Sequence, residues 1–147
     1  MRIFATLFVT LLAVPAFAAC DAGRTVFMSC SFQNGGKTVE VCASKSTASY
    51  RFGPRGGQAE LALSVPVSDV DYAPWPGVGS SIFEAVTFYN NTVAYEVYAG
   101  VDRNPSASGK QNVPFGGINI FENGAQIATL ECDDGSVAFP WTDVLSR

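Results

Sequence analysis

The chain has 147 residues, with 13 acidic and 9 basic side chains, a formal net charge of −4 and no histidine. This length is enough for one domain with a hydrophobic core, and the acidic balance argues against non-specific binding to nucleic acid. Without histidine, Ser-His-Asp and Cys-His catalysis and histidine-ligated zinc are excluded, so the composition points away from an enzyme.

Residues 1–18 have the pattern of a secretory signal peptide. A short basic start at Met1-Arg2 precedes the apolar run Ile3 to Val14, and Ala16-Phe17-Ala18 is a small-x-small cleavage signal. The apolar run is too short to span a bilayer as a permanent helix. We therefore expect an exported mature domain, residues 19–147, in the periplasm or outside the cell. Loss of Arg2, the only charged residue of 1–18, would change the net charge from −4 to −5.

The four cysteines are Cys20, Cys30, Cys42 and Cys132. An even number in an exported chain predicts two disulfides, for which three pairings are possible. Lipidation of Cys20 is the alternative. The preceding Phe17-Ala18-Ala19 is a poor lipidation signal, and a lipidated Cys20 would leave an odd thiol.

The first half of the mature chain predicts four strands. Thr25–Phe32 and Lys37–Ala43 alternate apolar and polar residues on either side of a two-residue turn at Gly35-Gly36, which is typical of a β-hairpin. A short strand around Tyr50–Phe52 and a fourth over Ala59–Val65 follow.

The same hairpin predicts the disulfide pairing. With Gly35-Gly36 as the turn, Cys30 lies on the apolar face of the hairpin and Cys42 on the opposite face. Disulfide geometry disfavours a bond between opposite faces. The preferred pairing is therefore Cys30–Cys132 with Cys20–Cys42.

The second half predicts two further hairpins, with turns at Asn90-Asn91 and at Asn123-Gly124. Their strands are 81–89 with 92–101 and 115–121 with 125–131. About eight short strands at regular spacing predict an all-β fold, one antiparallel β-sandwich or small barrel.

The stretch 66–80 is the least strand-like part of the chain and holds the candidate binding loop. Its candidate residues are Asp71, Tyr72 and Trp75. Prolines on both sides of Trp75 restrict the backbone, and Tyr and Trp offer large contact areas with a polar tip. The alternative is that Trp75 folds back and closes one end of the sandwich.

Other candidate chemistry is weaker. Glu84 and Glu96 could form a hydrolytic carboxylate pair, but the predicted hairpin register puts them on opposite faces. Asp69 and Asp71 lack the further oxygen ligands of a cation site, so neither a metal nor a cofactor is expected. The tyrosines and phenylalanines of the second hairpin indicate cross-strand packing, with a ligand platform as the alternative.

Several segments resemble a group of small exported proteobacterial proteins for which no activity is established. They include Cys30 to Lys37, Tyr50-Arg-Phe-Gly-Pro, Tyr72 to Gly79 and Leu130-Glu-Cys132-Asp. This resemblance implies an envelope location and an all-β domain. The plan is more distantly similar to periplasmic lysozyme inhibitors, which combine a signal peptide, a small disulfide-linked β domain and loops that can enter an enzyme cleft.

Together these features predict a non-enzymatic periplasmic or secreted binding protein. Its most concrete form is an inhibitor of a hydrolase such as lysozyme, where an acidic surface would speed encounter with a basic enzyme. The alternatives are a module that binds carbohydrate or another envelope polymer, and a structural envelope protein with no soluble ligand. We expect no nucleic-acid partner and no transmembrane segment in the mature chain.

Overall fold

The computed structural model describes residues 20–103 and 113–145, so the predicted signal peptide and residues 104–112 lie outside the described residues. In this part of the chain there are nine strands and one short 3₁₀ helix, η1 (Val67–Asp69). The strands are β1 (Thr25–Phe32), β2 (Lys37–Ala43), β3 (Thr47–Pro54), β4 (Leu61–Pro66), β5 (Asp71–Ala73), β6 (Ser81–Asn90), β7 (Val93–Asp102), β8 (Pro114–Glu122) and β9 (Ala125–Glu131).

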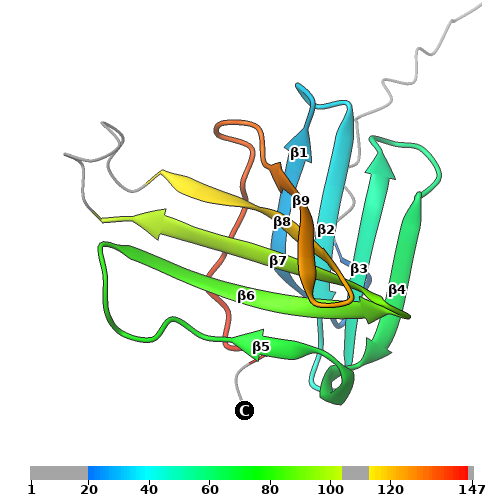
Figure 1. Cartoon of the computed structure of the whole chain (residues 1–147), viewed down its shortest axis with the longest axis horizontal. Coiled ribbons are helices and arrows are strands. Elements are labelled where there is room, and N and C mark those ends of the chain that lie inside the picture. Colours follow the sequence, from blue (N-terminus) through cyan, green and yellow to red (C-terminus); the bar gives the residue numbers. More distant parts are fainter. Residues whose placement is uncertain (1–19, 104–112, 146–147) are drawn as a thin grey trace, which may run out of the picture.

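The strands form two antiparallel sheets in sequence order. Sheet A contains β1 to β4 and sheet B contains β5 to β9. Figure 1 shows the two sheets face to face, with the strands of sheet A crossing those of sheet B at a steep angle. The prediction of an all-β antiparallel sandwich is confirmed, and the sheets do not close into a barrel.

The core lies between the sheets because alternate residues of each strand face inward. Sheet A supplies Met28, Val39, Val41 and Tyr50, among others, and sheet B supplies residues such as Val86, Phe88, Val97 and Ile118. One face of each sheet is thereby buried, and much of the other face of each sheet is directed toward solvent.

The structure differs from the sequence prediction in the number of strands and in two of the turns. The ninth strand, β5, lies inside the stretch predicted to be least strand-like. Phe32 pairs with Lys37, so the first turn has four residues, and Asn90 pairs with Val93, so the second turn is Asn91-Thr92. Each register is shifted by two residues from the prediction. An even shift keeps Cys30 and Cys42 on their predicted faces, but the irregularity between Val26 and Met28 places Phe27 in the core instead of Val26.

The longer first turn has a tertiary cause. The carboxylate of Asp133 accepts hydrogen bonds from the backbone N–H groups of Asn34, at 3.0 Å, and Gly35, at 2.8 Å, and from the Ser31 hydroxyl, at 2.8 Å. These bonds hold the pKa of Asp133 below its usual 3.8, with the Ser31 bond as the main cause. The turn is therefore shaped by a residue about a hundred positions away.

Both predicted disulfides are confirmed. Cys20 bonds to Cys42 and Cys30 bonds to Cys132. The second bond attaches the C-terminal segment to β1, and that segment continues along β1, where Ser29 and Ala138 exchange two backbone hydrogen bonds. Phe139 then packs on Phe27 in the core, at 5.6 Å between ring centroids, and the segment lies along the free edge of β1.

Candidate functional site

The predicted binding loop is divided by β5. Because successive residues of a strand point to opposite faces, Asp71 faces solvent while Tyr72 faces the sandwich interior. The carboxylate of Asp71 accepts a hydrogen bond from the Tyr89 hydroxyl on the neighbouring strand β6. That bond raises the pKa of Tyr89. The three predicted residues therefore do not form one contact surface.

Trp75 braces the loop that follows β5. Its indole N–H donates to the carbonyl oxygen of Val78 at 3.0 Å, and the Arg103 guanidinium carbon lies 5.0 Å from the centroid of its ring. Trp75 is half-buried and does not belong to the core. The most exposed apolar side chain of this loop is Val78, at 71%. The braced loop thus presents Val78 rather than the indole to solvent.

Glu84 and Tyr72 form a polar pair at the interior side of sheet B. The Glu84 carboxyl is hydrogen-bonded to the Tyr72 hydroxyl, and its Oε2 atom is buried with no hydrogen-bond partner. Burial raises the pKa of Glu84, although the bond to Tyr72 partly opposes that rise. Burial and the nearby Glu84 charge raise the pKa of Tyr72 to about 12. Glu96 lies on the other face of the sheet, so the prediction that these two glutamates lie on opposite faces is confirmed.

The outward side of sheet B, which we call the aromatic face, carries Phe83, Tyr89, Tyr98, Phe115 and Phe121. Phe83 and Tyr89 are 41% and 50% exposed. Tyr98 lies over Gly117, where a Cβ atom would come within 2.6 Å of the Tyr98 hydroxyl oxygen. Likewise, a Cβ atom on Gly100 would come within 2.7 Å of Phe83 Cβ. The two glycines leave room for these aromatic side chains close to the sheet.

A hydrogen-bonded row of polar side chains crosses the same face. Asn119 donates from Nδ2 to Glu96 Oε1 at 2.9 Å, and the Thr129 hydroxyl donates to Asn119 Oδ1 at 3.0 Å. Gln126 Nε2 donates to Thr129 Oγ1 at 2.7 Å. The row spans β7, β8 and β9, so the aromatic face combines apolar rings with preorganised amide, hydroxyl and carboxylate groups.

Charge is segregated between the sheets. Strands β5 to β9 contain six acidic residues and no lysine or arginine, whereas β1 to β4 contain Lys37, Arg51 and a single acid, Glu40. Four of the sheet B acids lie on the aromatic face, namely Asp71, Glu96, Asp102 and Glu131. Burial and the Glu131 and Glu96 charges raise the pKa of Tyr98. The aromatic face is therefore suited to a cationic ligand.

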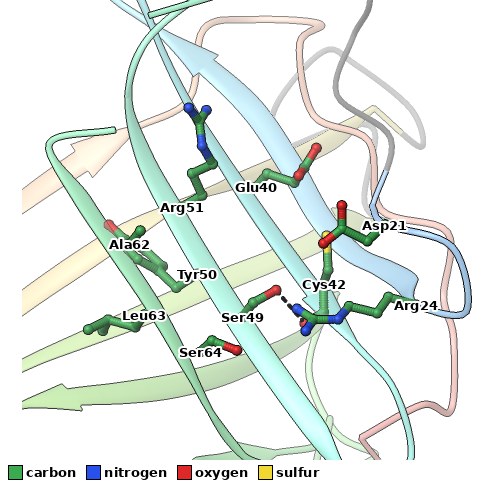
Figure 2. A pocket seen from close by; sticks show the side chains of 10 residues that line it. All are labelled: Asp21, Arg24, Glu40, Cys42, Ser49, Tyr50, Arg51, Ala62, Leu63 and Ser64. Carbon is green, nitrogen blue, oxygen red and sulfur yellow. Dashed lines mark hydrogen bonds between the residues drawn. The ribbon is translucent and has the colours of Figure 1, made fainter. Parts of the chain in front are cut away.

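A second candidate site is an open pocket of about 420 Å³ on the outward side of sheet A. Figure 2 shows Glu40 and Arg51 on adjacent strands, with Asp21 and Arg24 of the N-terminal segment forming one wall. Glu40 pairs with Arg51 in the register, and burial raises the pKa of Glu40. The Arg51 charge opposes this rise and the Asp21 charge adds to it.

Both surfaces are assembled from strands that the sequence places apart. The aromatic residues Phe83, Tyr89 and Tyr98 all belong to one predicted hairpin. The polar row could not be predicted in this way, because it depends on how β8 pairs with β7 and β9. The absence of basic residues from 81–102 and 114–131 is a signal that was present in the sequence. Its significance depends on those segments forming one sheet.

Comparison of the chain with known protein families, with curated proteins and with solved structures finds no match. The resemblances drawn from the sequence therefore remain expectations. No helix among the described residues is long and apolar enough to cross a membrane.

Proposed function

We propose that this protein is a non-enzymatic binding protein that recognises a basic protein partner, such as a lysozyme, through the aromatic face. The observation that carries the proposal is the charge segregation, with six carboxylates and no basic side chain in the strands of sheet B. Complementary charge speeds encounter, and exposed tyrosines are frequent anchors in protein interfaces.

The braced loop adds an apolar tip beside this face. Val78 and Phe83 are both exposed and lie at the β6 end of the loop, where Trp75 and Arg103 restrict its conformation. A restricted loop loses less conformational entropy when it binds. This arrangement is suited to insertion into the cleft of a hydrolase, which would make the bound protein an inhibitor.

The test is lysozyme activity and binding with purified mature protein at several salt concentrations. We expect inhibition of at least one lysozyme class, with association that slows as salt rises. The double variant Glu96→Gln/Glu131→Gln should slow association by about tenfold. Glu60→Gln, on the sheet A side of the molecule, removes one acidic charge away from the aromatic face and should slow association much less. Unchanged activity and no binding across lysozyme classes would contradict this function.

A second candidate is binding of an envelope glycan on the same face. It is favoured by the aromatic side chains close to the sheet over glycine and by the preformed polar row, because sugar rings stack on aromatic rings and hydrogen-bond to amides and carboxylates. Glycan binding that is lost in Tyr98→Ala and insensitive to salt would favour this candidate over the basic protein.

A further inference from the structure

The pocket of sheet A has a wall that is fixed covalently. The disulfide between Cys20 and Cys42 attaches the N-terminal segment to the outward side of β2. A turn follows, in which the Arg24 N–H donates to the Asp21 carbonyl oxygen at 3.0 Å. This places Asp21 and Arg24 beside the sheet surface, as Figure 2 shows.

The floor of the pocket is formed by two rows of cross-strand neighbours. Glu40, Arg51 and Ala62 form one row, and Cys42, Ser49 and Ser64 form the other. The Arg51 guanidinium is oriented by a hydrogen bond from Nη2 to the carbonyl oxygen of Gly57 at 2.9 Å. The pocket therefore has positive and negative groups on both its wall and its floor, with serine hydroxyls between them.

Asp21, Arg24, Glu40 and Arg51 line the same pocket, and no salt bridge joins these four described residues to one another. The salt bridge between Lys37 and Glu60 lies outside the pocket. Glu40 is half-buried and senses both Arg51 and Asp21. A ligand with a single charge would attract two of the four groups and repel the other two. A ligand carrying both charges can satisfy both kinds of group.

A metal ion is not suited to this pocket. Atoms of Cys20, Glu40 and Cys42 lie within 4.8 Å of one another, but both sulfurs are held in the disulfide. A cation would therefore find one carboxylate in this cluster, with Arg24 and Arg51 nearby. The pocket volume is in the range of sites for small organic ligands.

We propose that this pocket binds a compact zwitterion, in which an ammonium and a carboxylate lie close together, as in a free amino acid or a short peptide. Arg51 would bind the carboxylate and Glu40 the ammonium, with Arg24 and Asp21 supplying a second group of each sign on the wall. This inference is independent of the aromatic face, which lies on the other sheet.

The test is an NMR titration of the mature protein with four probes: glycine, alanyl-alanine, acetate and methylammonium. We expect shifts in the amide signals of residues 40–42 and 49–51 with one of the two zwitterions, and at least about tenfold weaker binding of acetate and methylammonium. Comparison of glycine with alanyl-alanine decides between a free amino acid and a peptide.

Variants test the assignment of the charged groups. Arg51→Gln and Glu40→Gln should each weaken zwitterion binding by about tenfold or more, because a charged hydrogen bond is lost. Lys45→Gln and Glu60→Gln change the same charges outside the pocket and should leave binding unchanged. Equal binding of acetate and glycine to the unmodified protein, or no shift with either zwitterion, would overturn the proposal. This result does not depend on whether the variants fold.

Discussion

Gly117 shows how one residue can determine a surface. A Cβ atom at this position would lie 2.4 Å from the Leu130 carbonyl oxygen and 2.6 Å from the Tyr98 hydroxyl oxygen. The first contact would displace the backbone of β9 and the second would lift the tyrosine ring from the sheet. The absence of a side chain at Gly117 is therefore part of the aromatic face.

Gly117→Ala should destabilise the fold by about 1–3 kcal/mol, because overpacking forces the backbone or Tyr98 to move. Urea unfolding measures this change. The control is Gly57→Ala, where the nearest atom is a side-chain carbon of Pro54 at 3.2 Å and the loss should be smaller. Equal stabilities of the two variants would contradict the close packing of Tyr98 on β8.

At the scale of elements, β5 depends on both sheets. It pairs with β6 through three residues, and Tyr72 reaches across the interior to Phe27 of β1, at 6.5 Å between ring centroids. The hydrogen bond between Tyr72 and Glu84 reinforces this short edge strand. Burial disfavours the ionised form of the Glu84 carboxyl in this pair.

This pair predicts a pH dependence of stability. The pKa of folded Glu84 is raised above 4.5, so the folded state holds its proton more tightly than the unfolded chain. The contribution of Glu84 to stability is then fully present below pH 4.5 and is lost as the pH rises through the folded pKa. Glu40 contributes with the same sign, and Asp133, whose pKa is lowered, contributes with the opposite sign.

Glu84→Gln should therefore reduce the fall in the urea midpoint above pH 4.5 without removing it. Glu122→Gln, which removes an exposed carboxyl charge at the end of β8, is the matched control. A profile for Glu84→Gln that is as steep as that of the unmodified protein would show that Glu84 does not contribute.

For the whole molecule, the two disulfides constrain very different lengths of chain. Cys30 and Cys132 are 102 residues apart, and Cys20 and Cys42 are 22 apart. In the chain-entropy treatment the longer loop contributes about 4–5 kcal/mol and the shorter about 3 kcal/mol. The longer link also holds the C-terminal segment against β1.

The double variant Cys30→Ala/Cys132→Ala should therefore lose more stability than Cys20→Ala/Cys42→Ala, by about 1–2 kcal/mol. Urea unfolding of both variants gives the comparison. The shorter link should matter more for zwitterion binding, because it fixes the wall of the sheet A pocket. A larger stability loss in Cys20→Ala/Cys42→Ala would contradict the loop-length argument.

The sequence by itself determined the fold class and the cysteine pairing. Alternation of apolar residues is a local pattern with a period of two, so it assigns each side chain to a face even when the turn length is wrong by two residues. For this reason the sequence correctly placed Cys30 and Cys42 on opposite faces, although the predicted register around Gly35 was shifted by two residues.

Only the tertiary structure decided which side chains became neighbours. Asp133 reshaped the first turn from the far end of the chain, and β5 formed because β6 was available to pair with it. The aromatic face and the sheet A pocket likewise join residues from several strands or from a disulfide-linked segment. Such neighbours depend on long-range register and packing, which the local pattern of residues does not contain.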